Sequence, residues 1–284
     1  MFEIVSNEAL APTVYRMVLR APDIATKHRA GNFVMLRVHE KGERIPLTVA
    51  DKDATAGTIT LVFQAVGKTT TELGELKAGD RLLDLVGPLG KPTRVEKFDG
   101  VTVCVGGGIG VAPVHPIACA LKAAGNRVIS IIGARSKELL VMEEEMVRAS
   151  TELLVATDDG SYGHAGFVTE VLQQVIEREG KDNIALVMAI GPVPMMRACC
   201  KVTEPYGVHT EVSLNPIMVD ATGMCGACRV SVAGETRFAC VDGPEFNGHQ
   251  VDFDELTKRL RIYLDDEKRA MQIHQEQHGS HVCH

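Results

Sequence analysis

The sequence contains no tryptophan, and aromatic residues make up only 4% of its 284 residues. It also lacks a long uninterrupted apolar run: the most apolar stretch, residues 101–121, is broken by glycines and prolines, which poorly suit a lipid-exposed helix. Basic residues are scattered rather than clustered. The sequence has 30 lysines and arginines and 37 aspartates and glutamates, which gives a net charge of −7. We therefore expect aliphatic cores, no membrane span and no nucleic-acid partner.

The N-terminus has little of what a secretory signal requires. Glu3 stands where a basic region would be expected, and no small-residue cleavage site follows an apolar segment. We therefore expect a cytoplasmic protein. In such a reducing compartment the eight cysteines are expected to be thiols or metal ligands rather than disulfides.

What is present is an ordinary globular composition, 45% hydrophobic and 24% charged, in a chain long enough for two or three small domains. Residues 1–98 contain short β-branched runs separated by glycine, proline and aspartate. This pattern predicts a small antiparallel β-barrel. The expected strands lie at 13–19, 33–38, 58–63 and 81–86, and a helix is expected at 70–76.

In residues 99–206, buried strands alternate with segments of helical periodicity, which is typical of a parallel sheet built from βαβ units. Residues 207–255 form a compact third piece that contains three cysteines. Residues 256–284 are the end of a helix predicted over 254–273, followed by a polar tail. The expected architecture is a β-barrel plus α/β: a barrel, a parallel-sheet nucleotide domain, and a small C-terminal domain. The elements expected in the nucleotide domain are strands at 101–105, 127–132, 153–156 and 184–190, with helices up to 124 and over 137–149 and 166–179, and another from 193.

The tail contains His274, His278, His281, Cys283 and His284 within eleven residues. Such a set could bind a metal, dock on a partner, or simply fray.

A glycine-rich turn, residues 106–110, follows the first strand of the nucleotide domain and opens a helix. Free N–H groups and the helix dipole at such a turn can hold a phosphate. The spacing departs from G-x-G-x-x-G, so a tight turn without a ligand remains an alternative. Arg135 and Lys137 follow the second strand, where basic residues favour a 2′-phosphate and thus NADP.

The cysteine pattern is more specific. Cys225 and Cys228 form a C-x-x-C pair and Cys240 follows. A plant-type [2Fe–2S] site, C-x4-C-x2-C…C, would place its first ligand at position 220. That residue is Asp220, whose carboxylate can also ligate iron. Two alternatives remain: structural zinc held by the three cysteines with Asp220 or His209, and a redox-active dithiol. The remaining cysteines fit no ligand spacing and most are expected in the cores: Cys104, Cys119, Cys199, Cys200 and Cys283.

A flavin site is indicated in the barrel. Arg44 could pair with a pyrophosphate, Thr48 could hydrogen-bond near the flavin N5, and the turn at 67–71 offers N–H groups to phosphate. A surface arginine and a capping threonine are the alternative reading.

The order of these motifs resembles the ferredoxin–NADP reductase superfamily. The motifs are R-x-P-L-T at 44–48, G-K-T-T at 67–70, the glycine turn, G-P-V-P-M-M at 191–196 and the cysteine loop at 219–229. Within the superfamily, the chain is similar to dihydroorotate dehydrogenase electron-transfer subunits. It is more similar to the small subunits of NADH-dependent reduced ferredoxin:NADP oxidoreductases, because that group has an aspartate and three cysteines. The resemblance implies FAD contacts at Arg44, Pro46, Leu47, Thr48, Phe63, Gln64, Gly67, Lys68, Thr69 and Thr70. It implies nicotinamide-nucleotide contacts at Gly107, Gly108, Ile109, Gly110, Arg135, Gly191, Pro192 and Met195, and cluster ligands at Asp220, Cys225, Cys228 and Cys240.

The implied activity is exchange of a hydride between NAD(H) or NADP(H) and FAD, with Thr48 at the flavin, and of single electrons with the [2Fe–2S] cluster. The implied partner is a larger flavoprotein of the glutamate-synthase small-subunit type with [4Fe–4S] clusters. The pair would couple NADPH, NAD and ferredoxin by electron bifurcation. A dihydroorotate dehydrogenase electron-transfer subunit and a zinc-stabilised nucleotide-binding regulatory module are the rival interpretations.

Overall fold

The structure is a computed structural model that describes residues 1–279, with side chains through Glu276. The histidine-rich tail beyond His274 therefore lies outside the described side chains. The N-terminal sheet is a near-closed antiparallel barrel in the order β6-β1-β2-β5-β4-β3-β7. Its strands are β1 (Phe2–Ala11), β2 (Val14–Arg20), β3 (Phe33–Arg37), β4 (Arg44–Asp53), β5 (Thr58–Gln64), β6 (Arg81–Leu82) and β7 (Asp84–Leu89), with helices α1 (Pro22–Lys27) and α2 (Lys68–Glu75).

The barrel prediction is confirmed, with two differences in its strands. β1 was not predicted, because Phe2–Ala11 mixes polar and apolar residues without regular alternation. In the structure, two register shifts interrupt its pairing with β2. β4 was not predicted either, because residues 44–48 were interpreted as a flavin-binding motif and not as a strand. The barrel core is aliphatic apart from Phe63, which stacks on Tyr15 with ring centroids 5.8 Å apart.

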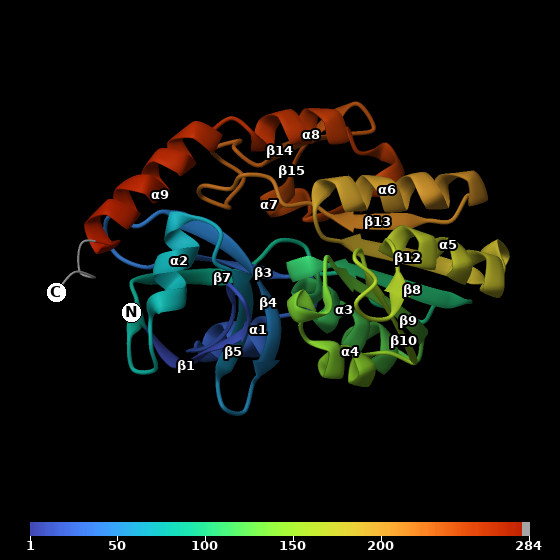
Figure 1. Cartoon of the computed structure of the whole chain (residues 1–284), viewed down its shortest axis with the longest axis horizontal. Coiled ribbons are helices and arrows are strands. Elements are labelled where there is room, and N and C mark those ends of the chain that lie inside the picture. Colours follow the sequence, from blue (N-terminus) through green and yellow to red (C-terminus); the bar gives the residue numbers. More distant parts are fainter. Residues whose placement is uncertain (280–284) are drawn as a thin grey trace.

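The second sheet has the order β11-β10-β9-β8-β12-β13-β16 and is parallel except for β16. Its helices cover both faces, with α5 and α6 on one side and α3 and α4 on the other (Figure 1). Its elements are β8 (Val101–Gly107), α3 (Val111–Ala123), β9 (Arg127–Ala134), α4 (Glu143–Ala149), β10 (Glu152–Thr157), β11 (His164–Ala165), α5 (Val168–Glu179), β12 (Ile184–Ile190), α6 (Val193–Thr203), β13 (Thr210–Ser213) and β16 (Glu245–Asn247). The predicted helix over 137–149 is wrong in its first half, where only a 3-10 turn, Lys137–Leu139, precedes α4.

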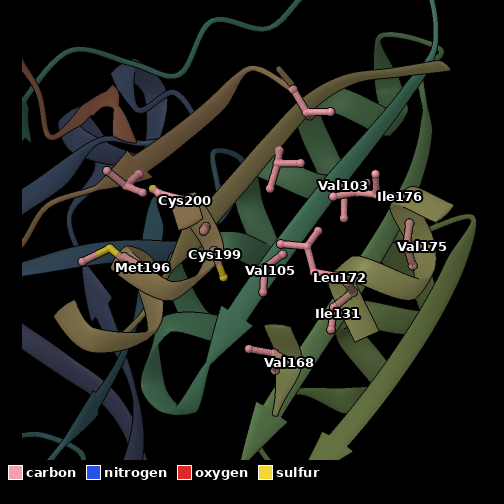
Figure 2. Close-up of a cluster of buried hydrophobic side chains, with 14 of the residues drawn as sticks. Val103, Val105, Ile131, Val168, Leu172, Val175, Ile176, Met196, Cys199 and Cys200 are labelled. Carbon is pink, nitrogen blue, oxygen red and sulfur yellow. The ribbon is translucent and has the colours of Figure 1, made fainter. Parts of the chain in front are cut away.

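Side chains from the sheet and two helices form the core on one face. Figure 2 shows Val103 and Val105 of β8 and Ile131 of β9 facing Leu172 of α5 and Cys199 of α6. The central strands β8, β9 and β12 are buried on both sides, as expected for a parallel sheet between helices.

The C-terminal part contains a two-stranded sheet, β14 (Arg229–Val232) with β15 (Glu235–Phe238), and a short helix α7 (Ala239–Asp242). The predicted helix over 254–273 is broken at residues 261–263 into α8 (Phe253–Leu260) and α9 (Leu264–Gly279). These two helices run from the α6 side of the molecule to the barrel, where α9 lies against α2 (Figure 1). His274 of α9 is buried there, with Nδ1 3.6 Å from Glu72 Oε1. None of the described helices is long and apolar enough to cross a membrane.

Candidate functional site

A cleft of about 920 Å³ opens between the barrel and the carboxyl ends of the strands of the second sheet. This volume lies in the range of cofactor and ligand pockets. The carboxyl edge of a doubly wound sheet, where strand order reverses, is where such folds bind ligands. The predicted site residues that line the cleft are Pro46, Leu47, Thr48, Phe63, Gln64, Thr70, Gly107, Gly108, Ile109, Gly110, Arg135, Gly191, Pro192 and Met195.

The barrel wall of the cleft is formed by β4, β5 and the start of α2. Pro46 to Thr48 come from β4, whose register places Thr48 opposite Phe33 of β3. Phe63 and Gln64 end β5. This wall is mostly apolar, and its polar groups are the hydroxyls of Thr48 and Thr70 and the amide of Gln64, which suits a planar heteroaromatic ring with polar edges.

Four predicted flavin residues do not line the cleft: Arg44, Gly67, Lys68 and Thr69. Arg44 is exposed at the start of β4. The buried Thr69 hydroxyl donates to Glu43 Oε2 at 2.8 Å, and Lys68 Nζ lies 3.8 Å from Glu72.

Two backbone N–H groups of the turn before α2 are already hydrogen-bonded within the protein. Thr70 Oγ1 accepts hydrogen bonds from the N–H groups of Val66 and Gly67, both at 3.1 Å. A phosphate at this turn would therefore depend on the N–H groups of the first turn of α2 and on nearby cations such as Arg44 and Lys68.

The opposite wall of the cleft is the glycine turn. β8 ends at Gly107, a 3-10 turn spans Gly108–Gly110, and α3 follows. A Cβ atom at Gly110 would lie 2.2 Å from the carbonyl oxygen of Ile190, at the end of β12. Only glycine lets these two chain segments approach so closely.

A methionine packs against the same turn. A Cβ atom at Gly107 would lie 2.2 Å from Met195 Sδ. α6 begins directly after Gly191 and Pro192, and Met195 lies in its first turn. The two predicted nucleotide segments, 107–110 and 191–195, are thus in contact across the strand ends.

Arg135 and Asp158 follow neighbouring strands and both line the cleft. Arg135 comes after β9 and Asp158 after β10, and the Asp158 N–H donates to the carbonyl of Ala134. Arg135 was predicted and Asp158 was not, although Asp158 lies two residues after the strand predicted at 153–156. The acid that binds ribose in many nucleotide-binding sheets follows the second strand, whereas Asp158 follows the third, but a carboxylate that lines the cleft can also accept a hydrogen bond from a ribose hydroxyl.

The cysteine loop, residues 219–229, and Cys240 together provide two pairs of candidate metal ligands. Cys228 and Cys240 are buried with Sγ atoms 3.2 Å apart. Asp220 accepts hydrogen bonds from the Thr222 N–H at 3.0 Å and from the Cys225 N–H at 3.1 Å. The bond from Thr222 is the chief cause that holds the pKa of Asp220 below its usual value, so this side chain is a carboxylate.

Burial, aided by the hydrogen bond with Cys228, raises the pKa of Cys240 to about 12. The donor set fits a two-iron cluster, which divides its four protein ligands between two irons. Asp220 with Cys225 and Cys228 with Cys240 would be such pairs. Among the described side chains, no three His, Cys, Asp or Glu residues surround one metal position, either for zinc or for iron.

The cysteine loop adjoins the cleft. Phe33 and Met218 belong to the same buried cluster as Cys228 and Cys240, and both also line the cleft. The sequence reading did not find Phe33 and Met218, because no motif marks them. Other cleft residues that it missed include Phe167, Ser213, Leu214, Asn215 and Pro244.

Barrel, nucleotide sheet, shared cleft and adjoining cysteine loop together define a ferredoxin–NADP reductase-like oxidoreductase subunit. Residues 104–201 match the family model of the oxidoreductase NAD-binding domain. Residues 215–252 match the iron–sulfur cluster binding domain of dihydroorotate dehydrogenase B.

Relatives and solved structures extend this similarity to nearly the whole chain. The chain is 50% identical over 266 residues to a dihydroorotate dehydrogenase B (NAD(+)) electron transfer subunit homolog of Thermotoga maritima, covering 94% of this chain and 93% of the relative. It is 35% identical to the electron transfer subunit of dihydroorotate dehydrogenase B (NAD(+)) of Geobacillus thermodenitrificans, covering 87% and 96% of the two chains. The chain therefore belongs to the family of dihydroorotate dehydrogenase B electron-transfer subunits.

A solved structure of NADH-dependent reduced ferredoxin-NADP oxidoreductase, described for flavin-based electron bifurcation, contains a chain that is 47% identical. It superposes with a TM-score of 0.90 over 96% of this chain and 97% of the other. The expected class of FAD- and NAD-binding oxidoreductase with an iron–sulfur domain is confirmed.

Proposed function

We propose that this chain is an electron-transfer subunit that exchanges hydride between NAD(H) and FAD, and single electrons between FAD and a [2Fe–2S] cluster. The observation that carries the proposal is the single cleft between barrel and nucleotide sheet. Through Phe33 and Met218 it shares a buried cluster with the cysteine pair Cys228 and Cys240. A flavin is required between the two other groups, because it accepts a hydride and releases electrons one at a time.

Residues of the barrel wall would hold the flavin. The apolar side chains of Leu47 and Phe63 provide a surface for the ring, and Thr48 and Gln64 offer polar groups at its edge. Thr48 is the residue that we place at the reacting edge. Arg44 and Lys68 lie outside the cleft and are suited to the phosphates only.

Residues of the opposite wall would hold the nucleotide. The glycine turn leaves room for a pyrophosphate, and Met195 with Gly191 marks the nicotinamide end. Asp158 and Arg135 line the same cleft, and a carboxylate there would favour a free ribose hydroxyl, because it would repel a 2′-phosphate. This is the reason for proposing NAD(H), in agreement with the nucleotide named for the relatives.

The cluster would be held by Asp220, Cys225, Cys228 and Cys240. The ordered Asp220 carboxylate supplies the anionic oxygen where the plant-type spacing has a cysteine.

The proposed partner is a larger flavin- and [4Fe–4S]-containing subunit of the glutamate-synthase type, with ferredoxin reached through the complex. The similarity to the bifurcating oxidoreductase structure supports this choice. The second candidate is a dihydroorotate dehydrogenase partner, which the names of several relatives support.

An anaerobic visible spectrum with flavin, iron, sulfide and zinc assays tests the cofactor proposal. One FAD with about two iron and two sulfide per chain is the expected result. Flavin with one zinc and no sulfide would contradict the proposed transfer of single electrons from FAD to an iron–sulfur cluster. Stopped-flow reduction of the flavin by NADH and NADPH then tests the nucleotide, and faster reduction by NADPH would overturn NAD(H). Co-purification at native expression level identifies the partner class.

A further inference from the structure

One cysteine departs from the expected core position. Cys104, Cys199 and Cys200 are buried, and burial raises the pKa of each thiol to about 12. Cys119 is exposed on α3. It is neither a predicted cluster ligand nor a residue of the cleft.

Cys119 has a histidine one helical turn before it. His115 Nε2 lies 3.5 Å from Cys119 Sγ. Residues four apart on a helix lie on the same face, so the contact follows from the spacing. His115 itself is buried, with 9% of its surface exposed, whereas Cys119 is an exposed residue.

A backbone carbonyl fixes the protonation of the imidazole ring. His115 Nδ1 lies 3.0 Å from the carbonyl oxygen of Ala50 in β4. A carbonyl oxygen can only accept a hydrogen bond, so Nδ1 carries the hydrogen. In the neutral ring, Nε2 is then the acceptor, and it faces the Cys119 thiol.

The Ala50 carbonyl is available because β4 is irregular at this residue. Val49 pairs with Leu61 and Asp51 pairs with Thr60, so Ala50 is the extra residue of a β-bulge in the ladder with β5. A bulge leaves one residue unpaired and redirects its groups. Here it directs a carbonyl to the helix of the neighbouring sheet.

The surroundings of His115 make its ring a stronger base than an ordinary imidazole. Burial lowers its pKa, but the hydrogen bonds with Cys119 and with Ala50 and the charge of Asp51 outweigh this and raise the pKa above the usual value. Cys119 and Asp51 are the titratable groups that act on the ring.

We propose that Cys119 is a reactive thiol and a site of covalent modification by small disulfides, with His115 as its base and the Ala50 carbonyl as the group that orients the base. A nucleophile, a base within hydrogen-bond reach and an orienting third group form the arrangement that activates cysteines elsewhere. In the step, the Cys119 proton moves to His115 Nε2 and the thiolate attacks one sulfur of the disulfide. The new S–S bond forms as the old one breaks, and the departing thiolate takes up the proton. Cys119 is oxidised and the small disulfide is reduced to one thiol and the mixed disulfide.

The test measures alkylation of Cys119 in the purified full-length chain by iodoacetamide between pH 5 and 9, with peptide mapping by mass spectrometry. His115→Asn keeps a donor for Ala50 and removes the base. We expect Cys119 to be alkylated at least about tenfold more slowly at pH 7 in this variant, because no base then accepts the thiol proton. We also expect oxidised glutathione to give a mixed disulfide at Cys119 in the wild type that dithiothreitol reverses.

Two controls accompany the test. Cys119→Ser must lose the label, and His209→Asn, an exposed histidine bonded to Glu211, must leave the rate unchanged. A wild-type rate that is half-maximal near pH 8.5, the value of an ordinary thiol, would overturn the proposal. If His115→Asn does not fold, the wild-type profile decides alone: a half-maximal rate below about pH 7.5 supports the proposal, and one at or above that pH contradicts it.

Discussion

The Sγ atoms of Cys228 and Cys240 lie 3.2 Å apart although twelve positions separate the two residues in the chain. The hairpin of β14 and β15 brings them together, with Arg229 of β14 paired with Phe238 of β15. The N–H of Ala239 donates to the carbonyl of Cys228 at 3.1 Å and closes the loop. The sulfur pair is therefore built by strand register, and a metal cluster would bind to a geometry that the hairpin sets.

Cys228→Ser is expected to lower bound iron and sulfide to well below one cluster per chain, because serine is a poor ligand at a thiolate site. Iron and sulfide assays on anaerobically purified protein measure this loss. Cys199→Ser, which changes a buried cysteine of α6 outside the loop, is the matched control and should retain full iron. Equal iron in both variants would remove Cys228 from the ligand set.

Gly110→Ala is expected to destabilise the fold by about 1–3 kcal/mol and to weaken nucleotide binding. The added Cβ would lie 2.2 Å from the Ile190 carbonyl oxygen and 2.7 Å from Gly191 Cα, both backbone atoms that cannot move aside easily. Denaturant unfolding and NADH titration measure the two effects.

Gly108→Asn provides the comparison within the same turn. Its φ is 54°, in the left-handed region that asparagine tolerates, and an added Cβ would meet nothing within 4 Å. It should lose less stability than Gly110→Ala. The reverse order would show that backbone crowding at Gly110 is not what limits this turn.

Asp158→Ala is expected to raise the KM for NADH about tenfold and to improve the use of NADPH, since a carboxylate hydrogen bond to the ribose contributes about 1.5–3 kcal/mol. Ferricyanide reduction with each nucleotide measures the change. Asp159→Ala is the neighbouring control, because Asp159 bonds Ser161 and does not line the cleft. An unchanged ratio of NADH to NADPH activity in Asp158→Ala would show that this acid does not contact the ribose.

Glu245→Gln is expected to stabilise the protein at alkaline pH. Burial raises the pKa of Glu245 to about 7 despite a hydrogen bond from Thr93 Oγ1 at 2.6 Å, and Glu211 raises it further. The folded state thus holds this proton to higher pH than the unfolded state, whose reference value is 4.5. The stability that the protonated Glu245 carboxyl contributes is fully present below pH 4.5 and is lost as the pH rises through about 7.

The gain for Glu245→Gln should therefore reach about 3 kcal/mol at pH 8 and vanish at pH 4. Urea unfolding at the two pH values measures it. Glu138→Gln, an exposed glutamate of the 3-10 turn before α4, should show no gain at either pH. A gain for Glu245→Gln that is the same at pH 4 and pH 8 would contradict the titration of Glu245 as its cause.

Short-range patterns were sufficient to predict most of the fold. The β-branched runs of β2, β3 and β5 and the alternation of strands and helices after residue 100 carry their own periodicity. The break between α8 and α9 was not predicted, because the exposed residues around it, such as Ile262 and Tyr263, continue a helical pattern. Only long-range packing distinguishes the two helices.

The cleft was predicted where a motif marks it and missed where tertiary contact alone creates it. The glycine turn and Thr48 are marked by local sequence, and the structure places both in the cleft. Phe33 and Met218 come from segments nearly 200 residues apart and meet only in the folded chain. Arg44 was selected for its charge, but a strand register, which sequence spacing does not reveal, places it outside the cleft.

The segment that contains the cysteine loop depends on the barrel for part of its buried core and on the nucleotide sheet for its flanking strands. Its buried cluster includes Phe33 and Met35 of the barrel, and the strands that flank it, β13 and β16, are the last two strands of the nucleotide sheet. An excised segment spanning 215–252 would expose these contacts and lack a core of its own. Exchange of this segment between relatives by recombination would therefore succeed only when the matching barrel face and sheet edge are exchanged together with it. The three parts are thus expected to evolve as one inherited unit.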